Sequence, residues 1–199
     1  MKKDLQESKL FTPYQMGPVT LRNRVIRSAA FESMGKDFAP TQDLKDYHVS
    51  VARGGVGMTT LAYASINRSG VSFNSQLWLR DEIVPQLKDI TDAVHAEGAA
   101  VGIQIGHCGN MTHWSTAGSF PVSASNGFNL YSPTFHRRMS HAEIAQTAKD
   151  FGKAVYTAHE AGFDSVEVHA GHGYLISQFL SPWTNRRRDE FGGSLENRM

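Results

Sequence analysis

The feature that most constrains the fold of this chain is a repeated order of amphipathic helix, glycine and short apolar strand. Apolar residues at helical spacing predict helices over Thr41–Arg53, Glu82–Glu97 and from Ser140 to the glycine at 162. A glycine follows each helix, and short apolar runs then predict strands over Met58–Ala64, Ala100–Ile105 and Ser165–His169. Strands that alternate with helices predict a parallel sheet with the helices packed outside it.

The N-terminal part adds two further elements before the first helix. Residues Tyr14–Leu21 predict a hairpin around Gly17-Pro18, and Arg24–Ser28 predicts a strand. Two closures then compete, a doubly wound open sheet and a (β/α)₈ barrel. A dinucleotide-binding doubly wound sheet carries the motif G-x-G-x-x-G after its first strand, but here the strand is followed by AAFESMG.

Side-chain alternation favours the barrel. In the third predicted βα strand, the aliphatic residues Val101, Ile103 and Ile105 have one parity and Gln104 has the other. In the last strand His169 has the parity opposite to the valines. If the aliphatic side chains pack on outer helices, Gln104 and His169 point inward near the carboxyl ends of their strands, where barrel enzymes carry their chemistry. Long loops are predicted after these strand ends, at Ile66 to Asp81, Gly106 to Met139 and Ala170 to Ser194.

Chain length allows only part of a barrel. A complete (β/α)₈ barrel takes about 250 residues, whereas these 199 residues hold about four βα units. We therefore expect an α/β fold of the TIM (β/α)₈-barrel type, a partial barrel preceded by the hairpin, with residues 1–199 as the N-terminal portion of one domain. Four strands leave two sheet edges unpaired, so we expect a poorly folded chain or pairing with another chain, including a homo-oligomer.

Composition excludes several classes of function. The chain has 20 Lys and Arg against 19 Asp and Glu, a net charge of +1, which gives no basic balance for nucleic acid. One cysteine, Cys108, excludes an intrachain disulfide. Apolar stretches are short, and the N-terminus lacks the apolar region of a secretory signal. We expect no membrane span and a cytoplasmic location.

The densest chemical signal follows the last predicted strand. His169, His172 and Tyr174 lie within six residues, among glycines. Two neutral histidines can donate paired hydrogen bonds to a carbonyl or nitro oxygen, and a phenol can deliver a proton. The alternative is that the histidines satisfy buried backbone groups and that Tyr174 belongs to the core.

A metal site is a further alternative. His107 could join His169 and His172 as a ligand, with Glu167 or Glu32 as the activating carboxylate of a metal-dependent hydrolase.

Three other features have both a structural and a chemical interpretation. Gln104 offers a donor and an acceptor that could pair with the imide edge of a flavin or pyrimidine. The run Arg186-Arg187-Arg188 could hold a phosphate, but the adjacent Asp189-Glu190 favours a salt-bridged loop. Cys108 beside His107 could be a reactive thiol, although a buried small residue is favoured.

Three segments carry a family resemblance. The run HAGHGYLISQFLSPWTNRRRDEFGGSLENR at 169–198 resembles the fourth-strand signature of the old yellow enzyme family of FMN-dependent ene-reductases. LFTPYQMGPVTLRNRVIRS at 10–28 resembles that family's hairpin and first strand, and GIQIGHCGN at 102–110 its third strand. The match extends over nearly the whole chain and corresponds to the N-terminal half of a family member.

The resemblance implies a TIM barrel that binds FMN and passes hydride from NADH or NADPH to the β-carbon of an activated alkene. His169 and His172 would then hold the substrate oxygen above the flavin, and Tyr174 would protonate the α-carbon. Gln104 would pair with the flavin pyrimidine edge. The other residues implied to contact the cofactor, mainly through the backbone, are Ser28, Ala29, Ala30, Phe31 and Tyr63.

The chain departs from the family pattern at three of these positions and at Asn110. Ala29 stands where proline is usual, and Phe31 replaces a Thr or Cys whose side chain hydrogen-bonds the flavin. Tyr63 replaces a small residue, and Asn110 replaces a common Arg. The family's strand-five basic residue and its loops after strands seven and eight, which hold the FMN phosphate, have no counterpart in these 199 residues. The sequence predicts an ene-reductase acting on a small-molecule activated alkene; the alternative is a non-catalytic partial barrel or interaction module.

Overall fold

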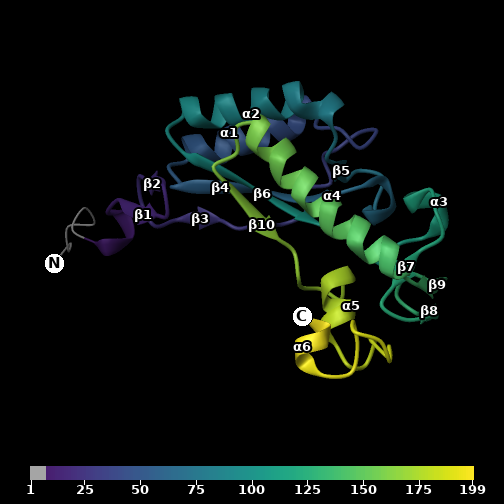
Figure 1. Cartoon of the computed structure of the whole chain (residues 1–199). Coiled ribbons are helices and arrows are strands. Elements are labelled where there is room, and N and C mark those ends of the chain that lie inside the picture. Colours follow the sequence, from purple (N-terminus) through teal and green to yellow (C-terminus); the bar gives the residue numbers. More distant parts are fainter. Residues whose placement is uncertain (1–7) are drawn as a thin grey trace.

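The structure is a computed structural model that describes residues 8–199. A parallel sheet forms its centre, with strand order β10-β6-β4-β3. These strands are β3 (Ile26–Arg27), β4 (Met58–Ser65), β6 (Ala100–Gly106) and β10 (Ser165–Val168). The short strand β5 (Leu77–Trp78) pairs with the end of β4. The order follows the sequence across the sheet, as in an arc of a parallel barrel (Figure 1).

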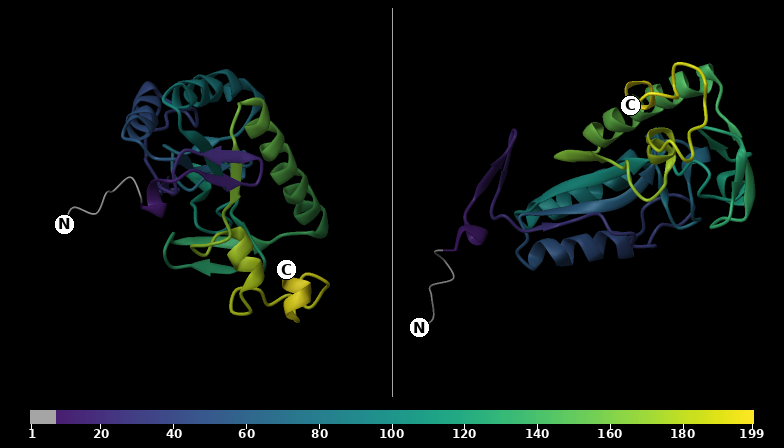
Figure 2. Two further views of the ribbon diagram at one scale, coloured as in Figure 1. Left: turned by 90° about the vertical axis from the view of Figure 1, so that its left-hand side faces the viewer. Right: turned by 90° about the horizontal axis from the view of Figure 1, so that it is seen from below.

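Three helices cover one face of this sheet, as the spacing of apolar residues predicts. They are α1 (Gln42–Arg53), α2 (Val84–Ala96) and α4 (His141–Glu160). Thr41 caps α1, and Ser140 caps α4 in a capping box with Glu143. The helices form an arc outside the curved sheet (Figure 2, left). None of the helices in residues 8–199 combines the length and hydrophobicity that a membrane crossing requires.

The main core lies between the sheet and these helices. Val101, Ile103 and Ile105 are fully buried there, together with Leu87 and Val94 of α2. The opposite, concave face of the sheet carries the residues that alternate with these aliphatic ones, which in β6 are Gly102, Gln104 and Gly106. A Cβ on Gly102 would meet Met58 and Ser165, and a Cβ on Gly106 would meet Tyr63 and His169. The alternation read from the sequence therefore assigns the two faces of β6 correctly.

A β-bulge in β4 changes the alternation at one point. Leu61 pairs with Ile103 and Ala64 pairs with Ile105, so three residues of β4 span two of β6. Leu61 and Ala64 both enter the core on the helix side, although a regular strand would put them on opposite faces. The bulge turns Tyr63 onto the concave face.

The remaining elements lie at the ends of the sheet. β1 (Tyr14–Met16) and β2 (Val19–Leu21) form the predicted antiparallel hairpin, with Gly17 at φ 56°. The segment after β6, predicted only as a loop, holds α3 (Trp114–Ala117) and a small sheet of β7 (Val122–Ser123), β8 (Gly127–Asn129) and β9 (Thr134–Arg138). α5 (Leu175–Leu180) and α6 (Leu195–Arg198) follow β10. Their spans of four to six residues are too short for a periodic signal.

Candidate functional site

A tight turn after β10 brings two histidines and a tyrosine together. The backbone N–H of His169 still donates to Ile105 of β6, at 2.8 Å. His172 then adopts φ 55° and Gly173 φ 71°, two successive residues in the left-handed region. The chain reverses there, and Tyr174 becomes the N-cap of α5. Backbone strain at a non-glycine residue is typical of functional sites.

The two imidazoles contact each other directly. Nδ1 of His172 lies 3.1 Å from Nε2 of His169, and the ring centroids are 4.9 Å apart. Burial of His169 and the neighbouring His172 lower the pKa of His169 below its usual value. His169 is therefore neutral at pH 7, with a single ring N–H. A ligand oxygen that enters between the rings can replace their mutual hydrogen bond and accept from both nitrogens.

Tyr174 lies beside His169, and its hydroxyl is held by a serine from another loop. The two rings meet edge to face, with centroids 5.0 Å apart. Ser72, in the loop after β4, donates to the Tyr174 hydroxyl oxygen at 3.3 Å. Burial raises the pKa of Tyr174, while the Ser72 hydrogen bond lowers it. The phenol thus stays protonated at neutral pH, and its own proton remains free to point into the site.

Tyr63 forms the wall behind this cluster. Its ring packs over Gly106 and lies 5.1 Å from the Tyr174 ring. Its hydroxyl donates to the Gly70 carbonyl at 2.8 Å, and burial raises its pKa well above the ordinary value. Tyr63 is therefore an aromatic wall, and Tyr174 is the phenol available for proton transfer.

Gln104 lies on the concave face of β6, in the position that the alternation predicts. Its side-chain Nε2 donates to the carboxylate of Glu167, which pairs with it across β6 and β10. Among residues 8–199 no hydrogen bond reaches the Gln104 carbonyl oxygen, so this oxygen can still accept one. The amide therefore suits the polar edge of a flat heterocycle such as a flavin.

The segment after β3 contributes exposed backbone and an aromatic pair. Ser28, Ala30 and Phe31 are exposed and Ala29 is half-buried, so the backbone there is open to a ligand. The carbonyl of Ala30 already accepts from Arg27. The Phe31 ring stacks on Phe73 at 5.3 Å, and this packing occupies the side chain that stands where the family has Thr or Cys.

Glu32, considered above as an activating carboxylate beside His169 and His172, is instead bonded to Arg27 and lies against His48. Its carboxylate is buried under α1, where it accepts from Arg27 at 2.6 Å and lies 3.2 Å from Nε2 of His48. Burial opposes its ionisation, but His48 and Arg27 together hold the pKa of Glu32 below its usual value. The carboxylate also accepts from the backbone N–H of Ala62, inside the β4 bulge. Glu32 is a structural anchor for that bulge.

The metal-site alternative gains no support from His107. Its Nδ1 accepts from the Gly109 N–H at 3.0 Å, and its Nε2 lies 3.1 Å from the Ser69 hydroxyl. Burial lowers its pKa to about 4. Within residues 8–199, the one group of ligand-type atoms close enough to share an ion is the surface trio His141, Asp189 and Glu190.

Two other residues singled out in the sequence, Cys108 and Arg187, are buried and have structural roles. Cys108 is fully buried, and burial raises the pKa of its thiol to about 12, which makes it unreactive. Arg187 is also buried and forms a two-point pair with Asp189, through contacts of 2.8 and 2.7 Å. The salt-bridged interpretation of the arginine run thus holds for Arg187.

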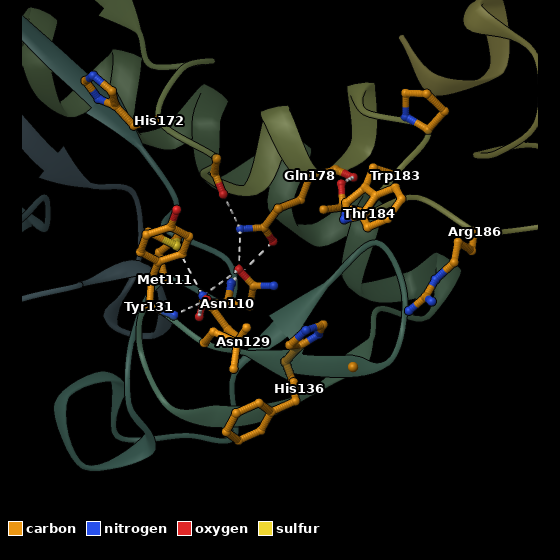
Figure 3. Close-up of a pocket in the computed structure, with 15 residues that line it drawn as sticks. Asn110, Met111, Asn129, Tyr131, His136, His172, Gln178, Trp183, Thr184 and Arg186 are labelled. Atoms are coloured by element: carbon orange, nitrogen blue, oxygen red, sulfur yellow. Dashed lines mark hydrogen bonds between the residues drawn. The ribbon is translucent and has the colours of Figure 1, made fainter.

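A groove opens next to His172, between the β8–β9 hairpin and the loop after α5 (Figure 3). Its volume is about 750 Å³. Asn110, Asn129 and Gln178 form its floor through mutual hydrogen bonds. Sequence reasoning named Asn110 only as a departure from the family pattern and included Gln178 only within the run at 169–198. It missed Asn129 and Ser72, which no local motif marks. The long predicted loops at Ile66 to Asp81 and Gly106 to Met139 were the available signal.

Comparison with known proteins identifies relatives for almost the whole chain. The model of the NADH:flavin oxidoreductase / NADH oxidase family matches residues 9–199. The 4,4'-dithiodibutanoate disulfide reductase of Rhodococcus erythropolis is 38% identical over 189 residues, which cover 95% of this chain and 47% of that protein. The NADPH dehydrogenase of Listeria welshimeri is 38% identical over 195 residues, 96% of this chain and 56% of that protein. The chain spans about half the length of these curated relatives.

Solved structures support the same assignment. The old yellow enzyme homologue from Zymomonas mobilis superposes with a TM-score of 0.89 at 30% identity, over 96% of this chain and 56% of that one. Morphinone reductase in complex with tetrahydroNAD gives a TM-score of 0.90 at 31% identity, over 96% and 57%. These matches confirm the partial TIM-barrel fold predicted from the sequence.

Proposed function

Because the chain belongs to the NADH:flavin oxidoreductase / NADH oxidase family, we propose that it supplies the substrate-facing residues of an FMN-dependent oxidoreductase. The reaction passes hydride from NADH or NADPH to an activated alkene, an α,β-unsaturated carbonyl or nitro compound. The observation that carries the proposal is the convergence of His169, His172 and Tyr174 at the carboxyl end of β10, on the concave face.

The concave face fits the polar edge and the flat ring of FMN. Within residues 8–199 the Gln104 side-chain oxygen accepts no hydrogen bond, and the segment after β3 (Ser28, Ala29, Ala30 and Phe31) is open to a ligand. Tyr63 and the His169 ring form an aromatic wall at the same end of the sheet, with centroids 5.9 Å apart. When bound, FMN supplies hydride storage and delivery. The residues of this chain supply substrate orientation and the proton.

His169 and His172 hold the substrate oxygen. Each imidazole can present one ring N–H to an oxygen that lies between them. Hydrogen bonds from both rings withdraw electron density from the conjugated alkene and stabilise the negative charge that develops on the oxygen as hydride arrives at the β-carbon.

Tyr174 gives its proton to the α-carbon. Its hydroxyl oxygen accepts from Ser72, so the O–H bond is free to point toward the substrate held by the histidines. Ser72 then stabilises the phenolate that remains. Tyr63 cannot replace Tyr174, since its hydroxyl proton is committed to the Gly70 carbonyl.

The first test is the visible spectrum of the full chain after incubation with excess FMN and desalting. We expect a retained, perturbed flavin band and NADPH-driven reduction of an enone. Tyr174→Phe is expected to slow the alkene half-reaction by about 10²-fold, the usual contribution of a positioned acid, and to leave flavin reduction unchanged. Tyr156→Phe on the exposed face of α4 serves as the control.

A colourless protein after desalting means that these 199 residues do not hold FMN by themselves. A Tyr174→Phe variant with the wild-type rate of alkene reduction contradicts the proton-donor assignment. A soluble organic disulfide should be compared as acceptor, since the Rhodococcus relative is named for disulfide reduction. Faster turnover of the disulfide than of enones and nitroalkenes would count against the alkene substrate class.

A further inference from the structure

Hydrogen bonds between side-chain amides tie together the floor of the groove beside His172. Asn129 Nδ2 donates to the Asn110 carbonyl at 2.8 Å, and Gln178 Nε2 donates to the Asn110 side-chain oxygen at 2.9 Å. The Asn129 side-chain oxygen in turn accepts from the Tyr131 N–H (Figure 3). These amides hold the floor rigid. The walls add the larger part of the surface that a ligand would contact.

The walls are aromatic and exposed. Phe128 is 47% exposed, Tyr131 89% and Trp183 87%, and all three line the groove. These rings give the groove an apolar surface against which a ligand can pack. The volume of about 750 Å³ lies within the usual range for small-molecule sites.

The charged side chain that lines the groove is positive. Its lining includes Arg186 and no carboxylate. Arg186 donates to the Asn126 carbonyl at 3.1 Å and forms no ion pair within residues 8–199, whereas its neighbour Arg187 is fully paired with Asp189. His136 adds no charge at pH 7, because burial and the nearby Arg186 lower its pKa. Arg186 is thus an available cation at the edge of an aromatic groove.

We propose that this groove binds the part of the substrate remote from the reacting alkene, and that this part is a flat or aliphatic body ending in a carboxylate held by Arg186. The geometry connects the two ends, since His172 lines the groove and also contacts His169. The identity of the reacting end rests on the proposed function. Recognition of the anionic end requires only residues of the groove.

The test is a binding titration that needs no flavin. The full chain is titrated with phenylbutanoate and with phenylbutanamide, its uncharged counterpart, and binding is measured by calorimetry and by tryptophan fluorescence. We expect the carboxylate to bind about tenfold more tightly than the amide, the size of a charge-assisted hydrogen-bonded pair. Arg186→Gln should abolish this preference. Trp183→Phe should remove the fluorescence change while calorimetric binding persists.

The matched control is Arg188→Gln, which removes an exposed arginine two residues away that does not line the groove. Equal affinity for the carboxylate and the amide overturns the proposal, as does an equal loss in the Arg186 and Arg188 variants. Preferential displacement of phenylbutanoate by adenosine monophosphate would assign the groove to a coenzyme phosphate and also overturn it. Failure of alkene reduction with intact phenylbutanoate binding contradicts the proposed function alone.

Discussion

His172 shows how one residue's backbone sets the site. Its φ of 55° is unfavourable for a side chain with a Cβ, at a cost of about 1–3 kcal/mol. The cost is offset by the contacts that surround the turn, among them the hydrogen bond from Gln178 Nε2 to the Gly173 carbonyl at 2.6 Å. In return the imidazole lies within hydrogen-bonding distance of His169. The surrounding fold therefore preorganises the pair for a ligand oxygen.

The hydrogen bond from Ser72 to the Tyr174 hydroxyl gives a prediction about a single residue. We expect Ser72→Ala to slow alkene protonation by about tenfold, because a hydrogen bond to a charged phenolate contributes about 1.5–3 kcal/mol in proteins. Loss of this bond also raises the pKa of Tyr174 further, so the alkaline limb of the pH–rate profile should move to higher pH. Stopped-flow kinetics of the alkene half-reaction across pH measures both effects.

The serine series has an internal control in the same loop. Ser75 bonds to Ser33 rather than to Tyr174, so Ser75→Ala should leave the profile in place. Ser72→Thr keeps a hydroxyl and should restore most of the rate. A profile that Ser72→Ala does not move, or that Ser75→Ala moves equally, means that Ser72 has only a structural role.

At the scale of elements, the β4 bulge decides what faces the site. It spans Leu61 to Ala64, and the Ala62 N–H inside it donates to the Glu32 carboxylate. Glu32 is held in turn by Arg27 and His48. A buried ionic network thus fixes the irregular backbone that turns Tyr63 toward Tyr174, in agreement with the frequent occurrence of bulges next to active sites.

The capping box of α4 gives a prediction about stability. Ser140 accepts from the Glu143 N–H, and the Glu143 carboxylate accepts from the Ser140 N–H at 2.8 Å. Ser140→Ala should lower the free energy of unfolding by about 1 kcal/mol. Arg137 and Ser140 together lower the pKa of Glu143 from 4.5 to about 2.

This pKa shift sets the pH dependence of the Glu143 contribution. A carboxylate whose pKa is lower in the folded state stabilises the fold above its unfolded pKa. The stability difference between wild type and Glu143→Gln should therefore be complete above about pH 4.5 and vanish as the pH falls toward 2. Chemical denaturation at a series of pH values measures it. Glu160→Gln is the control, because it removes a carboxylate at the opposite end of the same helix, outside the capping box.

At the scale of the whole molecule, the sheet has two open edges. Within residues 8–199, β3 and β10 are the outer strands, and β4 and β6 lie between them. Val168 of β10 is 52% exposed and Ile26 of β3 is 45% exposed. Outer strands with apolar side chains and unpaired backbone groups are prone to pair with another chain. We propose that copies of this chain associate through these edges.

Hydrogen exchange followed by mass spectrometry tests this proposal. Amides of β4 and β6 should exchange most slowly, because each of these strands is paired on both sides, and amides of β10 faster. Raising the protein concentration should increase protection in β10 and β3 and leave β6 unchanged. Exchange in β10 that is independent of concentration, together with a monomeric sedimentation profile, contradicts edge pairing.

The sequence by itself determined the order of the elements and the two faces of β6. Helical spacing, glycine stops and the Ser140–Glu143 pair are local signals, and the predicted helices and strands agree with the structure to within a few residues. The exceptions are β3, which is shorter than predicted, and the short elements inside segments predicted as loops or left unassigned, which are β5, α3, the small sheet after β6, α5 and α6. Alternation also placed Gln104 and His169 correctly, because β6 and β10 are regular.

Only the tertiary structure decided the rest of the site. Regular alternation from Leu61 would turn Tyr63 toward the helices, and a bulge pinned by Glu32 reverses it. Ser72 and Tyr174 are 102 positions apart, and Arg186 and Asn126 are 60 apart. Such contacts depend on how the loops at the carboxyl ends of the strands converge in space. Local sequence propensity cannot predict this convergence, because the convergence follows from the curvature of the sheet and the packing of distant segments.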